Sequence, residues 1–138
     1  QGRGRLMQYE PTLSRAELID LATRKYFASV DAKDIEAALD CFHEEALFCV
    51  QTEFTRHAGK PAIRKMFEGF MGAYETIVHK DFTCTVDEKN GRITASFEAV
   101  LTAADGSVTR LFNTNFWRIR DGKFQEVYVY FSGANVLV

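Results

Sequence analysis

The chain has 138 residues, of which 46% are hydrophobic and 26% charged, with a formal net charge of −2 and a sequence pI of about 5.9. A chain of this length fits one domain and can bury roughly two-thirds of its unfolded surface, so it needs no disulfide or metal to hold a core. The mildly acidic balance excludes the broad positive field that gathers nucleic acid or an anionic membrane, and we expect neither as a partner.

Targeting and redox signals are sparse. No run approaches the ~20 apolar residues of a membrane span and no apolar signal region opens the chain, so we expect a cytoplasmic protein. Cys41, Cys49 and Cys84 are an odd number at spacings that match neither Cys-x-x-Cys nor a zinc pattern. We predict buried free thiols in a reducing compartment, and neither a metal nor a cofactor.

The first residues look foreign to the fold. Gln1 and Gly2 stand where an initiator Met would, which is typical of the remnant of a cleavable tag, and Arg3 and Arg5 fit either a native or a tag origin. We therefore predict a tag remnant or flexible N-terminus over residues 1–10. A single domain is expected over residues 11–138.

A capping box marks the first helix. The Ser14 hydroxyl can accept from the Glu17 N–H while the Glu17 side chain reaches back, so a helix is predicted from Ser14 to near Asp31. Apolar residues recur on it every four positions and form its core-facing stripe: Leu18, Ala22, Tyr26 and Val30.

Two more helices and a short strand follow. Asp34 can cap a second helix whose apolar positions are Ile35, Ala38, Leu39 and Phe42. After the polar break at residues 43–45, residues 46–52 are short, apolar and β-prone, and we predict the first strand there. A loop then leads to Pro61, which suits the first position of a third helix ending near Tyr74.

From residue 76 the hydrophobic period changes to two. Strands are predicted over residues 76–87 and 92–102, followed by a long hairpin over residues 107–131. The turns fall at Asn90-Gly91, Asp105-Gly106 and Asp121-Gly122, dipeptides that favour tight β-turns. Helices on one side of an antiparallel meander define an α+β domain.

Alternation divides the hairpin into two faces, and both carry large apolar groups. One face presents Leu111, Asn113, Asn115, Trp117 and Ile119 together with Val127, Val129 and Phe131. The other presents Phe112, Phe116, Tyr128 and Tyr130. Because helices cannot cover both faces, we predict that the first lines a pocket and that the second forms a homodimer interface.

The order of helix, helix, strand, helix and meander resembles the nuclear transport factor 2-like superfamily, which includes ketosteroid isomerase, scytalone dehydratase and the SnoaL-like polyketide cyclases. The resemblance is most specific in residues 24–48, RKYFASVDAKDIEAALDCFHEEALF, and in residues 115–135. It implies a conical fold: a curved antiparallel sheet, made of the short first strand and the four-strand meander, wraps around a pocket closed by three N-terminal helices.

The resemblance also suggests roles for residues. The oxyanion-binding tyrosine of ketosteroid isomerase falls on Tyr26, and its second oxyanion donor, a protonated carboxylic acid, falls on Asn115, which can donate but is never acidic. Its general base falls on Val50, which cannot accept a proton. Tyrosines that support the first one in some members fall on Phe42 and Phe67.

A scytalone-dehydratase-like reading offers His79, since Ile77-Val78-His79 resembles the strand that carries one of that enzyme's catalytic histidines, although no second His follows on later strands. Gln51 and Glu53 could supply a displaced carboxylate if the first strand carried a bulge. His43 and His57 are expected at the surface.

We predict one concave, mostly apolar pocket as the ligand site. Its expected lining is Leu18, Ala22, Tyr26, Val30, Phe48, Val50, Met66, Phe70, Asn113, Asn115, Trp117, Val127, Val129 and Phe131. Val50 in place of a base favours a module that binds a small apolar ligand without turnover. The alternative is a lyase or isomerase (a dehydratase or cyclase) that acts by proton transfer on a small apolar carbonyl or hydroxyl compound. Tyr26 and Asn115 would stabilise the charge on oxygen, and His79 or Glu53 would move the proton.

Overall fold

The computed structural model describes residues 10–138, so the expectations for residues 1–9 lie outside the described residues. Its helical segments are α2 (Arg15–Ile19), η1 (Asp20–Lys25), α3 (Tyr26–Asp31), α4 (Ile35–Leu39) and α5 (Lys60–Ala73). Its strands are β1 (Phe42–Val50), β2 (Thr55–Ala58), β3 (Thr76–Asp87), β4 (Arg92–Thr102), β5 (Val108–Arg120) and β6 (Lys123–Tyr130). The α+β class is confirmed. No helix within residues 10–138 is long and apolar enough to cross a membrane.

The six strands form one sheet in the order β2-β1-β6-β5-β4-β3. The predicted antiparallel meander from β3 to β6 is confirmed. The expectation of a wholly antiparallel sheet is wrong, because β1 pairs in parallel with β6, with Val50 opposite Val129. The first strand also begins at Phe42 instead of residue 46, and the sequence analysis missed the edge strand β2, which pairs with β1.

The tight turns form where Gly follows Asp or Asn. Asp121 and Gly122 both have positive φ, 52° and 74°, as a type I′ hairpin requires. At Gly91, with φ of 63°, a Cβ would come within 2.5 Å of the Ile119 carbonyl oxygen, so only glycine fits. These turns set the register that decides which side chains face inward.

The first helix is continuous from Arg15 to Asp31 but contains a π segment, η1. The predicted capping box is present: Glu17 N donates to Ser14 Oγ at 3.2 Å and Ser14 N donates to Glu17 Oε1 at 2.9 Å. The π segment brings Phe27 onto the buried face beside Tyr26, a change that the regular four-residue spacing did not predict.

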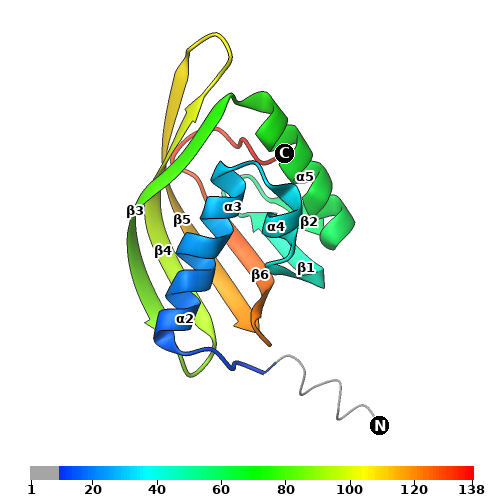
Figure 1. Ribbon diagram of the computed structural model, residues 1–138, viewed down its shortest axis with the longest axis vertical. Helices are drawn as coiled ribbons and strands as arrows, with labels where there is room; N and C mark the ends of the chain where they lie inside the picture. Colours follow the sequence, from blue (N-terminus) through cyan, green and yellow to red (C-terminus); the bar gives the residue numbers. More distant parts are fainter. Residues whose placement is uncertain (1–9) are drawn as a thin grey trace.

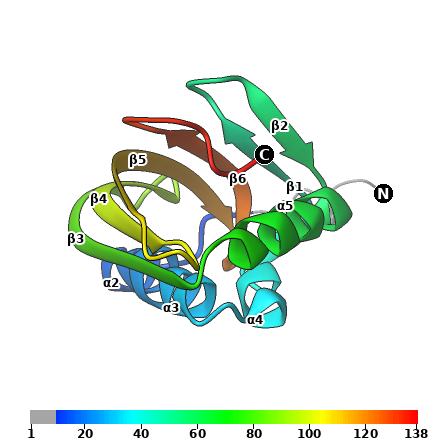
Figure 2. The same ribbon diagram turned by 90° about the horizontal axis from the view of Figure 1, so that it is seen from above.

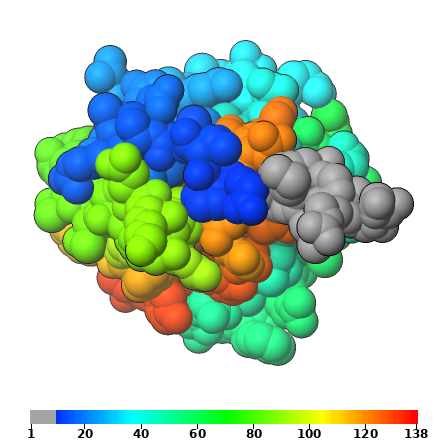
Figure 3. Space-filling model, turned by 90° about the horizontal axis from the view of Figure 1, so that it is seen from below, coloured from blue at the N-terminus to red at the C-terminus, as the bar shows by residue number. Residues whose placement is uncertain are grey.

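The sheet curves around the helices. Figures 1 and 2 show α2, η1 and α3 crossing its concave side near β3 and β4, while α5 packs beside β1 and β2. From below, the chain near residue 10 lies between the β3–β4 and β5–β6 turns (Figure 3), and Asp121 N donates to the Glu10 carbonyl at 2.7 Å. The predicted conical arrangement is confirmed.

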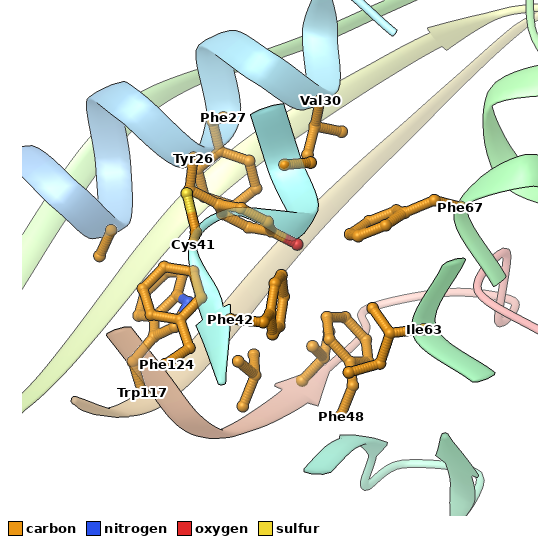
Figure 4. Packing of buried hydrophobic residues seen from close by; sticks show 14 of the residues in the cluster. Tyr26, Phe27, Val30, Cys41, Phe42, Phe48, Ile63, Phe67, Trp117 and Phe124 are labelled. Carbon is orange, nitrogen blue, oxygen red and sulfur yellow. The ribbon is translucent and has the colours of Figure 1, made fainter. Parts of the chain in front are cut away.

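Aromatic side chains fill the end of the interior near α4. Figure 4 shows Tyr26, Phe42, Trp117 and Phe124 packed against one another, and the ring centroids of Phe42 and Phe124 are 5.1 Å apart. All four are buried. Phe42, expected on the second helix, instead opens β1 and packs here. This end of the molecule is a dense core, and the open space lies towards α5.

Candidate active site

One cavity lies between the concave side of the sheet and the helices α3 and α5. Its lining includes His79 and seven residues of the expected pocket: Tyr26, Val30, Phe48, Phe70, Asn113, Asn115 and Val129. It also includes Phe27, Phe67, Phe97, Ala99, Leu101, Leu111, Val136 and Leu137. The structure thus brings together the tyrosine, the histidine and both amides, which lie up to 89 positions apart in the sequence. Their roles towards a ligand stay predictions.

Other residues expected in the pocket do not line this cavity. Leu18, Ala22, Val50, Met66, Trp117 and Val127 are buried in the surrounding core, and Phe131 is half-buried beyond β6. Trp117 shows why: it lies two positions beyond Asn115 on β5, about 7 Å along the strand, where it packs against Tyr26 and Phe124. The alternation predicted the face correctly, but it does not predict where along the strand the cavity ends.

Two amides in the cavity wall lack partners. Asn113 and Asn115 are 5% and 3% exposed, and their Oδ1 atoms have no hydrogen-bond partner among the described residues. A buried polar atom without a partner costs about 1–3 kcal/mol of folding free energy. Since both oxygens lie on the inner face of one strand, a ligand or ordered water that donates hydrogen bonds would satisfy them.

His79 and Asp31 form a hydrogen-bonded dyad at the cavity. Nδ1 of His79 lies 2.6 Å from Oδ1 of Asp31, and the backbone N–H of His79 donates to Oδ2 at 2.9 Å. The histidine side chain is 8% exposed and the aspartate side chain 25%. Because a carboxylate only accepts hydrogen bonds, Nδ1 is the donor in this pair, and Nε2 is the atom that has the lone pair in the neutral form of the ring.

Packing holds the imidazole in place from the other side. The ring of Phe27 stacks on that of His79 with centroids 4.3 Å apart and an interplanar angle of 24°. The π segment puts Phe27 in this position, and β3 presents His79 opposite Ala99 of β4. A ring fixed by stacking and by its Nδ1 contact, on a residue whose backbone N–H binds the same carboxylate, is preorganised for proton transfer.

Tyr26 brings a hydroxyl to the same cavity. Burial raises the pKa of Tyr26 above its ordinary value, and nearby Cys41 and Asp31 raise it further. Its oxygen points away from the helix towards the space near Phe67 (Figure 4). Tyr26 therefore stays protonated at any physiological pH and is a hydrogen-bond donor rather than a base.

The remaining polar candidates lie elsewhere. His43 Nε2 is 2.6 Å from the Arg120 carbonyl oxygen and His57 Nε2 is 2.9 Å from the Leu137 carbonyl oxygen; both rings are half-buried, not simply exposed as expected. Gln51 accepts from the Cys49 thiol, and Glu53 is exposed in the turn after β1. No displaced carboxylate therefore reaches the cavity from this strand.

The prediction of buried thiols is confirmed for Cys41 and Cys49 and wrong for Cys84. All three are free; Cys41 and Cys49 are buried and Cys84 is half-buried. Burial raises the pKa of the Cys41 thiol to about 11, so it is inert at neutral pH. Within the part of the chain that the structure describes, no group of three or more His, Cys, Asp or Glu side chains could hold a metal ion.

The sequence analysis missed Asp31, which is the most important omission. The prediction placed the helix end near Asp31 but assigned the side chain no role. An acidic residue in the last turn of a helix is unfavourable, because the partial charge there is negative. That local conflict was the available signal that Asp31 has a partner elsewhere, although the sequence does not show that His79 is that partner.

Comparisons with known proteins agree with the architecture. A family model described as a SnoaL-like domain matches residues 23–127. No curated protein matches the chain.

Solved structures from several bacteria share the fold. A candidate aromatic ring hydroxylase from Novosphingobium aromaticivorans is 23% identical with a TM-score of 0.74, covering 89% of this chain and 94% of that one. A candidate polyketide cyclase from Xanthomonas campestris is 21% identical, with a TM-score of 0.71 and coverage of 84% and 90%. A candidate isomerase from Bacillus subtilis is 18% identical, with a TM-score of 0.76 and coverage of 87% and 90%. Identities this low establish a shared fold and nothing finer.

Proposed function

This chain belongs to the SnoaL-like domain family of the nuclear transport factor 2-like superfamily, and from that premise we propose that it is an enzyme that moves a proton on a small neutral ligand. His79 is the base, Asp31 orients it, and Tyr26, Asn113 and Asn115 bind the ligand's oxygen atoms. The observation that carries the proposal is the 2.6 Å contact between His79 Nδ1 and Asp31 Oδ1 at the wall of the cavity.

The dyad of His79 and Asp31 provides a candidate for the base that is missing at position 50. Val50 cannot act as a base, which by itself favours binding without turnover. His79 supplies the missing function from the opposite edge of the sheet, on β3, with Nε2 as the ring atom left for the ligand. A carboxylate that holds the Nδ1 proton also stabilises the imidazolium formed when Nε2 takes a proton.

The lining limits the ligand to a neutral compound. Among the described residues, the cavity wall contains no Lys, Arg, Asp or Glu, so neither an anion nor a cation would find a compensating charge there. Most of the wall is aromatic or aliphatic. A small carbonyl or hydroxyl compound with an apolar ring fits this wall. A ligand hydroxyl can donate to the unpaired Oδ1 of Asn113 or Asn115, and a ligand carbonyl can accept from the Tyr26 hydroxyl or from an amide N–H.

Proton abstraction next to a carbonyl, or loss of water from a hydroxy ketone, would use these groups directly. Nε2 of His79 takes the carbon-bound proton while the developing negative charge on oxygen is stabilised by donors such as the Tyr26 hydroxyl. In the loss of water, the enolate then expels the β-hydroxyl group, which takes the proton back from the imidazolium and leaves as water. The names of the similar structures, which include a candidate cyclase and a candidate isomerase, support a reaction of this type. We do not expect isomerase activity on 3-oxo-steroids, because that reaction needs a base where Val50 lies.

Exchange of the α-protons of 2-tetralone in D₂O, followed by NMR, tests the proposal with a defined probe. We expect the protein to accelerate exchange, and His79→Gln to reduce the acceleration by about 10²- to 10⁴-fold, the usual worth of a general base. Asp31→Asn should reduce it less and should change the pH dependence, because the amide no longer stabilises the imidazolium. His43→Gln, a histidine outside the cavity, is the control and should leave exchange unchanged.

Binding without turnover is the second candidate. It is favoured by the absence of a base at Val50 and by a cavity that, as it stands, leaves little space for a substrate. If 2-tetralone binds but its exchange is not accelerated by the wild-type protein, this candidate replaces the enzyme.

We also propose that the protein is a homodimer formed through the outer face of the sheet. Phe112 is 65% exposed there, Phe116 44% and Tyr130 41%, and the rings of Phe116 and Tyr130 contact each other with centroids 5.7 Å apart. Exposed aromatic residues gathered on one face are a feature of interfaces, and two-fold pairing is the commonest closure. Its cytoplasmic location stays a prediction.

A further inference from the structure

The cavity is too small for the ligand that its wall suggests. The space that water-sized atoms could occupy inside it is about 30 Å³, enough for one or two water molecules. A cavity that binds benzene has a volume of about 150 Å³. A ring compound can therefore reach His79 and the amides only if part of the wall moves.

The walls differ in how firmly they are held. Strands β1, β4, β5 and β6 each pair with a neighbour on both sides, whereas β3 is an edge strand that pairs with β4 over ten residue pairs. Helix α5 buries Ile63, Met66, Phe67, Phe70 and Met71. Helix α3 contributes Tyr26, Phe27 and Val30, all buried. The last wall is residues 132–138, a segment without regular secondary structure that follows β6 and contributes Val136 and Leu137 to the cavity. Both of these side chains are only half-buried.

Few hydrogen bonds hold this segment over the cavity, and its main anchors are on β2. Asn135 Nδ2 donates to Thr55 Oγ1 at 3.1 Å, and His57 Nε2 lies 2.9 Å from the Leu137 carbonyl oxygen. Moving the whole segment would break these two contacts and the hydrogen bond that Phe112 N donates to Ser132 Oγ at 2.8 Å, and it would expose the half-buried side chains of Val136 and Leu137. Moving α5 would expose five fully buried ones, so the segment is the wall that yields first.

We propose that residues 132–138 form a gate over the cavity, latched to β2 by Thr55 and His57, and that Leu137 sets the size of ligand admitted. The inference rests on the proposed function in that the cavity is taken as the ligand site. Strand β2 contributes no buried side chain to the core, and in this proposal its function is to carry Thr55 and His57, which hold the gate closed. It also makes ligand size depend on a residue far in sequence from the dyad.

The size determinant is tested with phenol and 2-naphthol as neutral probes of one and two rings, with affinities measured by calorimetry. Leu137→Ala should strengthen 2-naphthol binding by at least about tenfold, because a few methylene groups decide fit in an apolar pocket. Phenol affinity should change by less than threefold. Val138→Ala, at the neighbouring exposed position, should change neither. An unchanged ratio of the two affinities in Leu137→Ala would overturn the role of Leu137.

The rate constants of ligand binding test whether Thr55 holds the gate closed. Thr55→Val removes the hydroxyl that accepts from Asn135 while keeping the size of the side chain. Both the association and the dissociation rate constants of phenol should rise by a similar factor, with little change in affinity, since a weaker latch opens the gate more often in both directions. Thr12→Val, on an exposed residue of the segment before α2, is the matched control. Unchanged rates in Thr55→Val would count against the latch.

Amide hydrogen exchange of the ligand-free protein separates this inference from the proposed function. The gate requires residues 133–138 to exchange through local opening, faster than β5, and Thr55→Val to accelerate them further. If neither probe binds any variant, the proposed ligand site is wrong, and exchange still decides whether the segment opens. Exchange of residues 133–138 as slow as that of β5 would overturn the gate whatever the probes do.

Discussion

The two faces of β5 break the usual rule of burial in opposite ways. The inner face carries Asn113 and Asn115, amides that are almost completely buried with unpaired oxygens, between Leu111 and Trp117. The outer face carries Phe112 and Phe116, which are exposed. Alternation along a single strand places these two anomalies one residue apart.

This contrast distinguishes residues that serve binding from residues that serve only the stability of the fold. A buried Leu or an exposed Arg needs no explanation, whereas a buried amide with an unpaired oxygen or an exposed aromatic patch is informative. The inner anomaly is polar, so it fits a small molecule with oxygen or nitrogen atoms. The outer anomaly is apolar, so it fits a protein surface. If each anomaly is functional, substitutions on the two faces should affect different measurements.

Trp117→Ala tests a large aromatic side chain on the inner face, whose Nε1 also has no hydrogen-bond partner among the described residues, and it has the largest expected effect on stability. Truncating this fully buried side chain should cost about 3–5 kcal/mol of unfolding free energy. Urea unfolding must be followed by far-ultraviolet circular dichroism, because Trp117 is the only tryptophan. A loss below about 1 kcal/mol would mean that the packing at this position is not as dense as described.

Tyr128→Glu tests the outer face. A charge buried at the centre of the aromatic patch should weaken dimer association by about 100-fold or more, and light scattering at micromolar concentration should detect the monomer. Phe112→Glu should do the same from the neighbouring strand. Because the Phe112 side chain is exposed, this variant should keep its fold, which circular dichroism checks. Lys89→Glu, in the β3–β4 turn, is the charge control. A wild-type monomer would contradict the proposed interface directly.

Asn115→Leu should have opposite effects on stability and on binding. Replacing a buried amide whose oxygen has no partner should raise the unfolding free energy by about 1–3 kcal/mol. The affinity for a carbonyl ligand such as 2-tetralone should fall more than that for tetralin, its hydrocarbon analogue. If stability falls and the two affinities fall equally, Asn115 is a structural residue and the comparison between the faces fails.

Thr114→Val has the smallest expected effect. Thr114 lies between the two amides in sequence but on the outer face, where its Oγ1 is 3.0 Å from Ser96 Oγ. The unfolding free energy of the monomer should change by no more than about 0.5 kcal/mol, as is usual for substitutions near the surface. Measuring it in a Tyr128→Glu background avoids any contribution from the dimer.

Local signals predicted much of this fold. Asp-Gly and Asn-Gly turns, the Ser14 capping box and the change of period at residue 76 are short-range patterns, and each corresponds to a structure formed by neighbouring residues. Strand β2 was not predicted, because its four residues, Thr55–Ala58, have no apolar run and form a strand only by pairing with β1. The π segment was not predicted, because no sequence signature distinguishes it from a regular helix.

The site was predicted less completely because its groups meet only through the tertiary structure. Tyr26, His79 and Asn115 could be proposed singly from their faces and from the family resemblance. The contact between Asp31 and His79 spans 48 positions, and Leu137 reaches the cavity from beyond the last strand. Periodicity reports which way a side chain faces, but not which distant side chain it meets.

The parallel pairing of β1 with β6 also affects how the protein folds. Phe48 lies opposite Val127, 79 positions later, so the two halves of the sheet cannot join until nearly the whole described chain is available. Pairings between such distant segments slow folding, because the entropy of closing the long loop is lost before the contacts form. The helices and β1 must therefore wait with their apolar surfaces exposed during synthesis. We expect this stage, before β6 arrives, to be the one most prone to aggregation.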